Sequence, residues 1–252
     1  MARHLRRVCG PSLTGRALQA GVDQAFGSYA RYWAESLRLP SASVAEVDAG
    51  MSWSGVGEIE IALQSGKGAI LALPHLGGWE WAGVWLINQG YKVTVVVEAL
   101  EPPELFEWFA GFRRRLGMEV VAVGQGAGAA VLRALKAGNV VCLLSDRNVG
   151  GAPGVEVDFF RERTRLPGGP ATLAIRTGVA VLPTAVYFSD RHGGHLGAVG
   201  RRLDTTYSGG FREGVVQVTQ TLARELEMLI REAPTQWHLM QPNWPSDPGY
   251  RP

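Results

Sequence analysis

The chain has no apolar run long enough to cross a bilayer, only two cysteines and almost no net charge. No stretch of its 252 residues reaches the roughly 18 to 20 apolar residues of a spanning helix, and the arginine-rich start lacks the apolar segment of a secretory signal. A net charge of +2 argues against a nucleic-acid-binding protein that works by neutralising phosphates. Cys9 and Cys142 are far apart, so we expect neither a disulfide framework nor a metal site, and a reducing compartment.

Several motifs of common enzymes are missing as well. The sequence contains no G-x-S-x-G turn, no Walker A loop, no H-E-x-x-H and no paired-cysteine site. These absences argue against an activated serine nucleophile and against zinc chemistry.

What the chain does contain is apolar material in a regular order. Apolar residues make up 46% of the sequence and charged residues 19%, which predicts a packed core. Short continuous apolar runs, typical of strands buried on both faces, alternate with helical patterns. The expected strands are 69–73, 93–97, 119–123, 140–144, 155–159, 180–188 and 195–201, and the expected helices are 78–88, 104–116, 127–137, 170–177 and 211–232. This order predicts a single-domain α/β/α sandwich over 1–252 with a mostly parallel central sheet.

The N-terminal region leaves two interpretations open. A helix at about 16–38 places Val22, Phe26, Tyr29, Trp33 and Leu37 on one side. This stripe indicates either a helix packed on the core or a helix that lies on a membrane surface, since the segment is also basic. We therefore separate a docking or packing region, 1–40, from an α/β core, 41–252.

The stretch ALPHLGGWEW places His75 directly after the strand 69–73 and Glu80 five residues later. Ligands of parallel α/β folds bind outside the carboxyl ends of strands. Across a strand–loop–helix junction Glu80 can fold back to bind one imidazole nitrogen, which would leave the other nitrogen as a base. The alternative is that the histidine caps a loop and the glutamate caps a helix.

A second stretch resembles a dinucleotide fingerprint. Gly124-x-Gly126-x-x-Ala129 joins a strand to a helix, and Asp146 follows about 20 residues on. Taken alone, this pattern indicates an NAD-binding oxidoreductase. Its position in the middle of the chain favours a plain glycine-rich turn.

Further polar groups lie near strand or helix ends. Arg113-Arg114-Arg115 ends a helix, where arginine suits either the helix dipole or a phosphate ligand. Asp146-Arg147-Asn148 follows one expected strand, and Phe160-Arg161-Glu162 follows another. The turn LPGGPATLAIRTG opens a helix whose free N–H groups suit an anion, or serves only as a turn.

Taken in order, these segments resemble the bacterial lipid A biosynthesis (lauroyl/myristoyl) acyltransferase family. The resemblance rests on the H-x4-E pair, FRRRLG, DRN, VEVDFF-x-E, LPGGPATLAIRTG and the terminal WHLMQPNW. It extends from about residue 14 to 245 and is strongest to the actinobacterial branch that acylates phosphatidylinositol mannosides. The chain has Asn148 where relatives commonly have aspartate. Relatives also usually begin upstream with an apolar docking helix, so either the natural start lies further upstream or the helix at 16–38 docks alone.

The resemblance implies a glycerolipid-acyltransferase-like fold and a reaction. A fatty acyl group would pass from acyl-CoA, or from acyl carrier protein as in lipid A-type members, to a sugar hydroxyl of a mannosylated phosphatidylinositol. No cofactor beyond the acyl-CoA co-substrate is implied, and the expected place is the cytoplasmic face of the bacterial plasma membrane. A lipid-binding module without catalysis is the remaining alternative.

The same resemblance suggests a role for each candidate residue. His75 would be the general base, Glu80 the group that orients it, and Glu162 a second acid beside it. Arg113, Arg114 and Arg147 would hold phosphates, with Asp146 beside Arg147 in the substrate site. Trp79 would flank the acyl groove or pack in the core.

Overall fold

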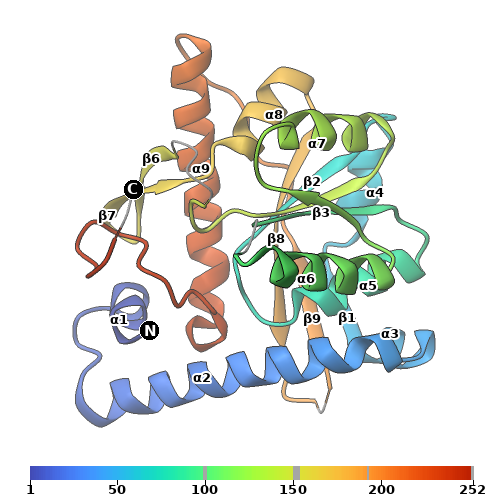
Figure 1. Cartoon of the computed structure of the whole chain (residues 1–252). Coiled ribbons are helices and arrows are strands. Elements are labelled where there is room, and N and C mark those ends of the chain that lie inside the picture. Colours follow the sequence, from blue (N-terminus) through green and yellow to red (C-terminus); the bar gives the residue numbers. More distant parts are fainter. Residues whose placement is uncertain (99–100, 150–153, 192, 251–252) are drawn as a thin grey trace.

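The computed structural model describes residues 1–98, 101–149, 154–191 and 193–250. Its centre is a seven-stranded sheet with the order β1-β9-β8-β2-β5-β3-β4 (Figure 1). All neighbouring strands run parallel except β8 and β9, which are antiparallel. The strands are β1 (Met51–Ser54), β2 (Ala69–Leu73), β3 (Val93–Val97), β4 (Glu119–Ala122), β5 (Val140–Leu144), β8 (Ala180–Phe188) and β9 (His195–Val199). The predicted α/β sandwich with a mostly parallel sheet is confirmed.

The sheet is covered on both faces, which explains its continuous apolar strands. Every residue of β2 is buried, because neighbouring side chains along this strand point into opposite hydrophobic layers. One layer is formed with α4 (Gly57–Leu63), α5 (Trp79–Asn88) and α6 (Pro103–Arg115). The other is formed with α7 (Ala127–Lys136), α8 (Gly169–Thr177) and α9 (Phe211–Glu232).

The segment 155–159 is a strand as predicted, but it lies outside the central sheet. β6 (Val155–Phe159) pairs with β7 (Glu162–Leu166) in a separate antiparallel hairpin that packs on α9. Phe160 and Arg161 form its two-residue turn, with φ values of 52° and 64°. Positive φ at both turn positions matches the right-handed twist of the strands in a tight hairpin. The run 155–159 is therefore part of this hairpin and not of the central sheet.

The N-terminal helices lie against one side of this core. α2 (Gly15–Arg38) runs along the lower edge of the molecule in Figure 1, and α1 (Ala2–Cys9) packs beside it. Only Ala25, Tyr32 and Ser36 of α2 are buried. Its predicted apolar stripe is thus not a core stripe, since Phe26 and Leu37 are each 54% exposed. Within the described residues, no helix is both long and apolar enough to span a membrane.

Candidate active site

His75 lies two residues beyond the end of β2, beside the end of β5. Strand pairing brings it there, since Leu73 of β2 is in register with Leu144 of β5. Two residues further along each strand, the His75 Nδ1 lies 2.6 Å from the Asp146 Oδ1, and the His75 backbone N–H donates to Oδ2 at 3.0 Å. The parallel pairing of two strands that are distant in sequence thus forms a His–Asp pair at the carboxyl edge of the sheet.

Asp146 is held rigidly in a buried position. Its side chain is fully buried, and the Trp237 indole N–H donates to the Asp146 Oδ2 at 2.7 Å. Burial by itself raises the pKa of Asp146, but the charge of His75 and the hydrogen bonds from His75 and Trp237 outweigh it and lower the pKa overall. Asp146 is therefore an anion that accepts the proton of Nδ1, which leaves Nε2 of His75 free to act as a base.

The loop that carries His75 is fixed by the segment after α9. Leu76 forms an isolated antiparallel bridge with Trp237, the Gly77 N–H donates to the Gln236 carbonyl at 3.0 Å, and the His238 N–H donates to the His75 carbonyl at 2.7 Å. Gly77 has a φ of 57°, and a Cβ there would meet the Val186 carbonyl oxygen at 2.0 Å. Only glycine fits this position, so the chain turns sharply between His75 and α5.

Glu80 does not contact the imidazole. Its side chain is 2% exposed, and its Oε1 accepts hydrogen bonds from the Tyr32 hydroxyl at 2.8 Å and from Arg113 at 2.9 Å. Among the described residues, the carboxylate partner of His75 is Asp146, so the expected hydrogen bond between Glu80 and the imidazole is wrong. The first turn of α5 directs Glu80 toward α2 and α6, where burial raises its pKa in spite of the opposing charge of Arg113.

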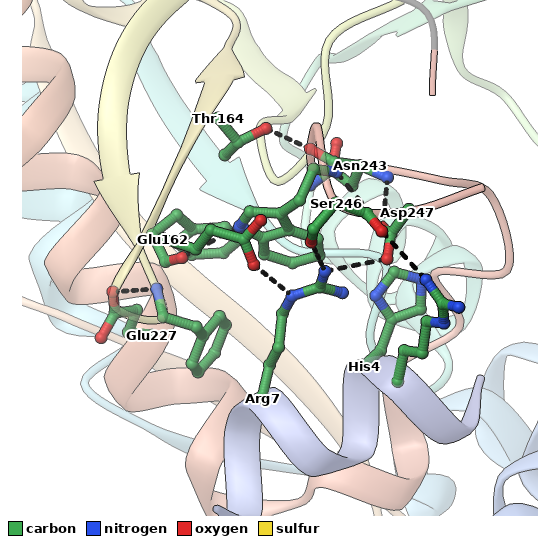
Figure 2. A network of polar contacts seen from close by, with 12 residues as sticks. His4, Arg7, Glu162, Thr164, Glu227, Asn243, Ser246 and Asp247 are labelled. Atoms are coloured by element: carbon green, nitrogen blue, oxygen red, sulfur yellow. Dashed lines mark hydrogen bonds and ion pairs between the residues drawn. The ribbon is translucent and has the colours of Figure 1, made fainter. Parts of the chain in front are cut away.

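Glu162 likewise has other partners. It opens β7 and accepts from Arg7 at 3.0 Å, in the polar network that Figure 2 shows between α1 and the C-terminal segment. Arg7 also binds Asp247 at 2.8 Å and lies 4.2 Å from the centre of the Trp244 ring. No contact joins Glu162 to His75 in the part of the chain that the structure describes, so its placement as a second acid beside the histidine was wrong. Glu162 instead binds Arg7 and so holds α1 against the β6–β7 hairpin.

The three arginines predicted for the site do not all lie together. Arg113 is held by Glu80 with its guanidinium 5.0 Å from the Trp79 ring centre. Arg147 pairs with Glu98 at 2.6 Å, and both arginines line the cavity described below. Arg114 is more than half exposed, pairs with Glu107 at 3.3 Å and is not part of the cavity wall. The structure therefore places two of the three with His75.

An apolar cavity of about 1100 Å³ opens beside His75. This volume is slightly above the range of about 300 to 1,000 Å³ that is usual for small-molecule sites. Trp79 is in the wall, and Arg113, Arg147 and His238 supply polar groups. Other wall residues come from both sides of the sheet and include Trp33, Gly83, Val95, Phe109, Met118, Val131, Cys142 and Leu173. The site thus combines one base with a long apolar space.

Trp237, His238 and Tyr32 belong to the site although the sequence did not assign them a role. His238 is buried against Ser28, whose Oγ lies 2.8 Å from Nε2. Burial first, and the nearby His75 second, lower the pKa of His238 to about 4. The available signal was the richness of the terminal segment in Trp and Pro, because large aromatic side chains are usually packed rather than left in a frayed end.

The glycine-rich turn at 124–129 does not form a dinucleotide site with Asp146. Gly126, with a φ of 87°, does precede α7 as the fingerprint expects. Asp146, however, is buried and already accepts three hydrogen bonds, from the His75 N–H, from its Nδ1 and from Trp237. Because the Asp146 side chain has no exposure to solvent, a ribose hydroxyl cannot reach it.

Comparison with known proteins agrees with this geometry. The sequence profile of a family described as bacterial lipid A biosynthesis acyltransferase matches residues 8–246. A protein of Mycobacterium tuberculosis (strain CDC 1551 / Oshkosh) named phosphatidylinositol mannoside acyltransferase is 40% identical over 225 residues, which cover 87% of this chain and 69% of the relative. A protein of the same name from Mycolicibacterium smegmatis is 38% identical over 229 residues, covering 90% of this chain and 73% of the relative.

Proposed function

The chain belongs to the bacterial lipid A biosynthesis acyltransferase family, and we propose that it moves a fatty acyl chain from acyl-CoA to a mannose hydroxyl of a phosphatidylinositol mannoside. The family and the names of its relatives support an acyltransferase. The choice of donor, of acceptor and of base is our proposal. The observation that carries it is that His75, paired with Asp146, lies in the wall of a large apolar cavity.

His75 acts as the general base in this reaction. Its Nε2 takes the proton of the acceptor hydroxyl as that oxygen attacks the carbonyl carbon of the thioester. The tetrahedral intermediate then collapses, the carbon–sulfur bond breaks, and the thiolate of CoA takes the proton back from the imidazolium. Asp146 stabilises the transient imidazolium and keeps Nδ1 protonated. No covalent acyl-enzyme is needed, because the acceptor itself is the nucleophile.

Two groups near His75 have positive polarity, the N-terminus of α5 and Arg113, whose charge Glu80 partly offsets. α5 begins at Trp79, four residues after the base, and the N-terminus of a helix favours a nearby anion. Arg113 lies against Trp79 in the cavity wall. Both features favour an oxyanion near this corner of the cavity.

The apolar cavity is the proposed place of the acyl chain. Trp79, Val95 and Met118 line it from one side of the sheet, and each buried methylene contributes about 0.8 kcal/mol. Arg113 and Arg147 are two of the cations in the cavity wall, and they suit substrate phosphates because a guanidinium binds phosphate oxygens in pairs. In the structure, Arg147 forms an ion pair with Glu98.

We further propose that the protein works on the cytoplasmic face of the plasma membrane. Phe26 and Leu37 of α2 are exposed, and Trp108 of α6 is 47% exposed on a helix that also contributes to the cavity wall. Arg16 and Arg38 lie on the same α2 helix. Exposed apolar side chains with basic neighbours suit the interface of an anionic lipid surface.

The test is a transfer assay with paired substrates. Purified protein is given radiolabelled acyl-CoA or acyl carrier protein as donor, and vesicles that contain phosphatidylinositol with or without mannose as acceptor. The proposal predicts labelled product only with the mannosylated lipid and preferentially from acyl-CoA. Preferential transfer from acyl carrier protein, or onto a non-mannosylated lipid, would contradict it.

A further inference from the structure

A second hollow, of about 750 Å³, lies between the β6–β7 hairpin and the start of α9. We call it the arginine groove, defined by Arg163, Arg165, Phe211, Arg212 and Gln220 in its wall. It is separate from the network of Arg7 and from the His75–Asp146 pair. Nothing in the proposed chemistry uses these residues.

The charges of the groove are only partly compensated. Arg163 is paired with two acids that also line the groove, Glu156 at 2.9 Å and Asp158 at 3.8 Å. Arg165 and Arg212 form no ion pair or hydrogen bond with any other residue that the structure describes. Arg176 adds a third cation at the border, with its guanidinium 5.0 Å from the Phe211 ring centre. The groove therefore offers guanidinium groups beside an exposed aromatic ring.

The groove adjoins the acyl cavity. Val155, Thr172 and Val215 line both hollows, so the two spaces share a wall and Arg176, which lines the cavity, also contacts Phe211 of the groove. A ligand with an apolar end in the cavity and an anionic end in the groove would extend over this shared wall.

The groove also lies at the opposite end of the molecule from the exposed face of α2. α9 has 22 residues, which make a helix about 33 Å long. The groove is lined by the first half of α9, from Phe211 to Gln220, whereas the segment that follows the last turn of α9, η2 (Pro234–Gln236), packs on α2 (Figure 1). A protein docked on a membrane by α2 would therefore present the arginine groove to the aqueous side.

We infer that the arginine groove binds the phosphate-bearing nucleotide of the acyl-CoA donor. This inference rests on the proposed function, because it assigns the water-soluble half of the proposed donor. Coenzyme A carries several phosphates and an adenine, and guanidinium groups with an aromatic ring recognise these groups. Arg113 and Arg147 are then left for the phosphodiester of the acceptor lipid.

The experiment compares the double variant Arg165→Ala/Arg212→Ala with wild type and with Arg224→Ala. Arg224 is exposed further along α9 and is not in the wall of either hollow. Binding of free coenzyme A is measured by calorimetry, and KM is measured for acyl-CoA and for an acyl-N-acetylcysteamine thioester, which has no nucleotide. We expect the double variant to lose coenzyme A affinity and to raise KM for acyl-CoA on the order of tenfold. KM for the short thioester should stay unchanged, and Arg224→Ala should behave as wild type.

Two results with the double variant would overturn the inference. One is undiminished coenzyme A binding by the double variant. The other is an equal rise of KM for both thioesters, which indicates general damage. A wild-type protein that binds no coenzyme A and uses only acyl carrier protein would overturn it as well. Wild type that transfers from no donor but still binds coenzyme A through Arg165 and Arg212 would instead refute the proposed function alone.

Discussion

Nδ1 of His75 lies 2.6 Å from the Oδ1 of Asp146, a carboxylate with no exposure to solvent. Two residues that are 71 positions apart in the chain meet because β2 and β5 are neighbours in register. The other carboxylate oxygen is fixed by Trp237 and by the backbone of His75. This pair determines which imidazole nitrogen of His75 holds a proton.

Asp146→Asn should abolish most of the activity without unfolding the protein. An amide in place of the carboxylate cannot stabilise the imidazolium and can select the wrong tautomer, which costs roughly 10³- to 10⁴-fold in kcat in comparable pairs. Steady-state kinetics should show kcat lowered and KM nearly unchanged. Trp237→Phe removes only the indole N–H and should lower kcat far less. Equal effects of the two substitutions would show that the charge of Asp146 is unimportant.

Glu80→Ala should reduce stability more than chemistry. It removes the acceptor of both Tyr32 and Arg113, and leaving a largely buried charge unpaired costs about 3 to 5 kcal/mol. Glu80→Gln should keep most of the stability, because an amide oxygen still accepts and because burial already raises the pKa of Glu80. Chemical denaturation measures the free energy of unfolding. A Glu80→Gln protein of normal stability that lacks activity would restore Glu80 to a chemical role.

Glu162→Gln should leave kcat nearly intact, while Arg7→Ala should loosen the N-terminus. Arg7 binds both Glu162 and Asp247 and covers Trp244, as Figure 2 shows for its polar partners. Its loss should cost a few kcal/mol and increase hydrogen exchange in α1 and in the segment around Trp244. A fall of kcat by orders of magnitude in Glu162→Gln would mean that Glu162 takes part in the reaction after all.

Stability should fall as the pH drops from about 6.5 toward 4. His238 has a pKa of about 4 in the folded protein, below its ordinary value of 6.5, first because it is buried and second because it lies near His75. The unfolded chain therefore binds more protons in this window, and acidification favours unfolding by on the order of 3 kcal/mol. Asp146, with its lowered pKa, adds a further loss of stability at still lower pH.

Replacement of His238 by Gln offers a control for this pH dependence. Gln cannot titrate but retains a polar group near Ser28. Thermal unfolding between pH 4 and 7 should show a shallower slope for His238→Gln than for wild type. Identical slopes would place the origin of the pH dependence in other groups, such as His4, whose pKa is also lowered to about 4.

Gly83→Ala should shorten the acyl chain that the protein accepts. A Cβ on Gly83 would lie 2.6 Å from the Met118 Cε, and both residues line the cavity. The flexible Met118 side chain would move into the cavity and displace methylene groups of the ligand. Each displaced methylene should reduce kcat/KM about fourfold, from about 0.8 kcal/mol. A series of acyl-CoA lengths measures this, and an equal loss at every length would argue against a role in chain selection.

The sequence predicted the elements of the sheet better than their arrangement. The strand 69–73 and the base at its end follow from local composition, because AILAL is a short, continuous apolar run that is followed by Pro and Gly. The partner of His75 did not follow, because the adjacency of β2 and β5 depends on strand order, which packing determines. Glu80 is close enough to His75 in sequence to suggest that the two side chains pair. The Glu80 carboxylate is instead held by Tyr32 and Arg113, and no local sequence pattern reveals these two partners.

The charged strand β7 is a second feature that could not be predicted from the sequence. ERTRL has too few apolar residues to indicate a strand, so Glu162 was read as a loop residue that follows a strand of the central sheet. Its strand character comes from pairing with β6 and from packing of Thr164 and Leu166. The mixture of charged and buried positions is typical of a hairpin with one solvated face.

The central claim is that His75, oriented by Asp146, is the base of an acyl transfer. Its most direct test is the single-turnover rate of label transfer from acyl-CoA to a phosphatidylinositol mannoside by wild type and by His75→Ala, with circular dichroism to verify that both are folded. We expect a folded His75→Ala protein whose rate is at least about 10²-fold lower, in line with loss of a general base. Near wild-type transfer by that folded variant would contradict the account.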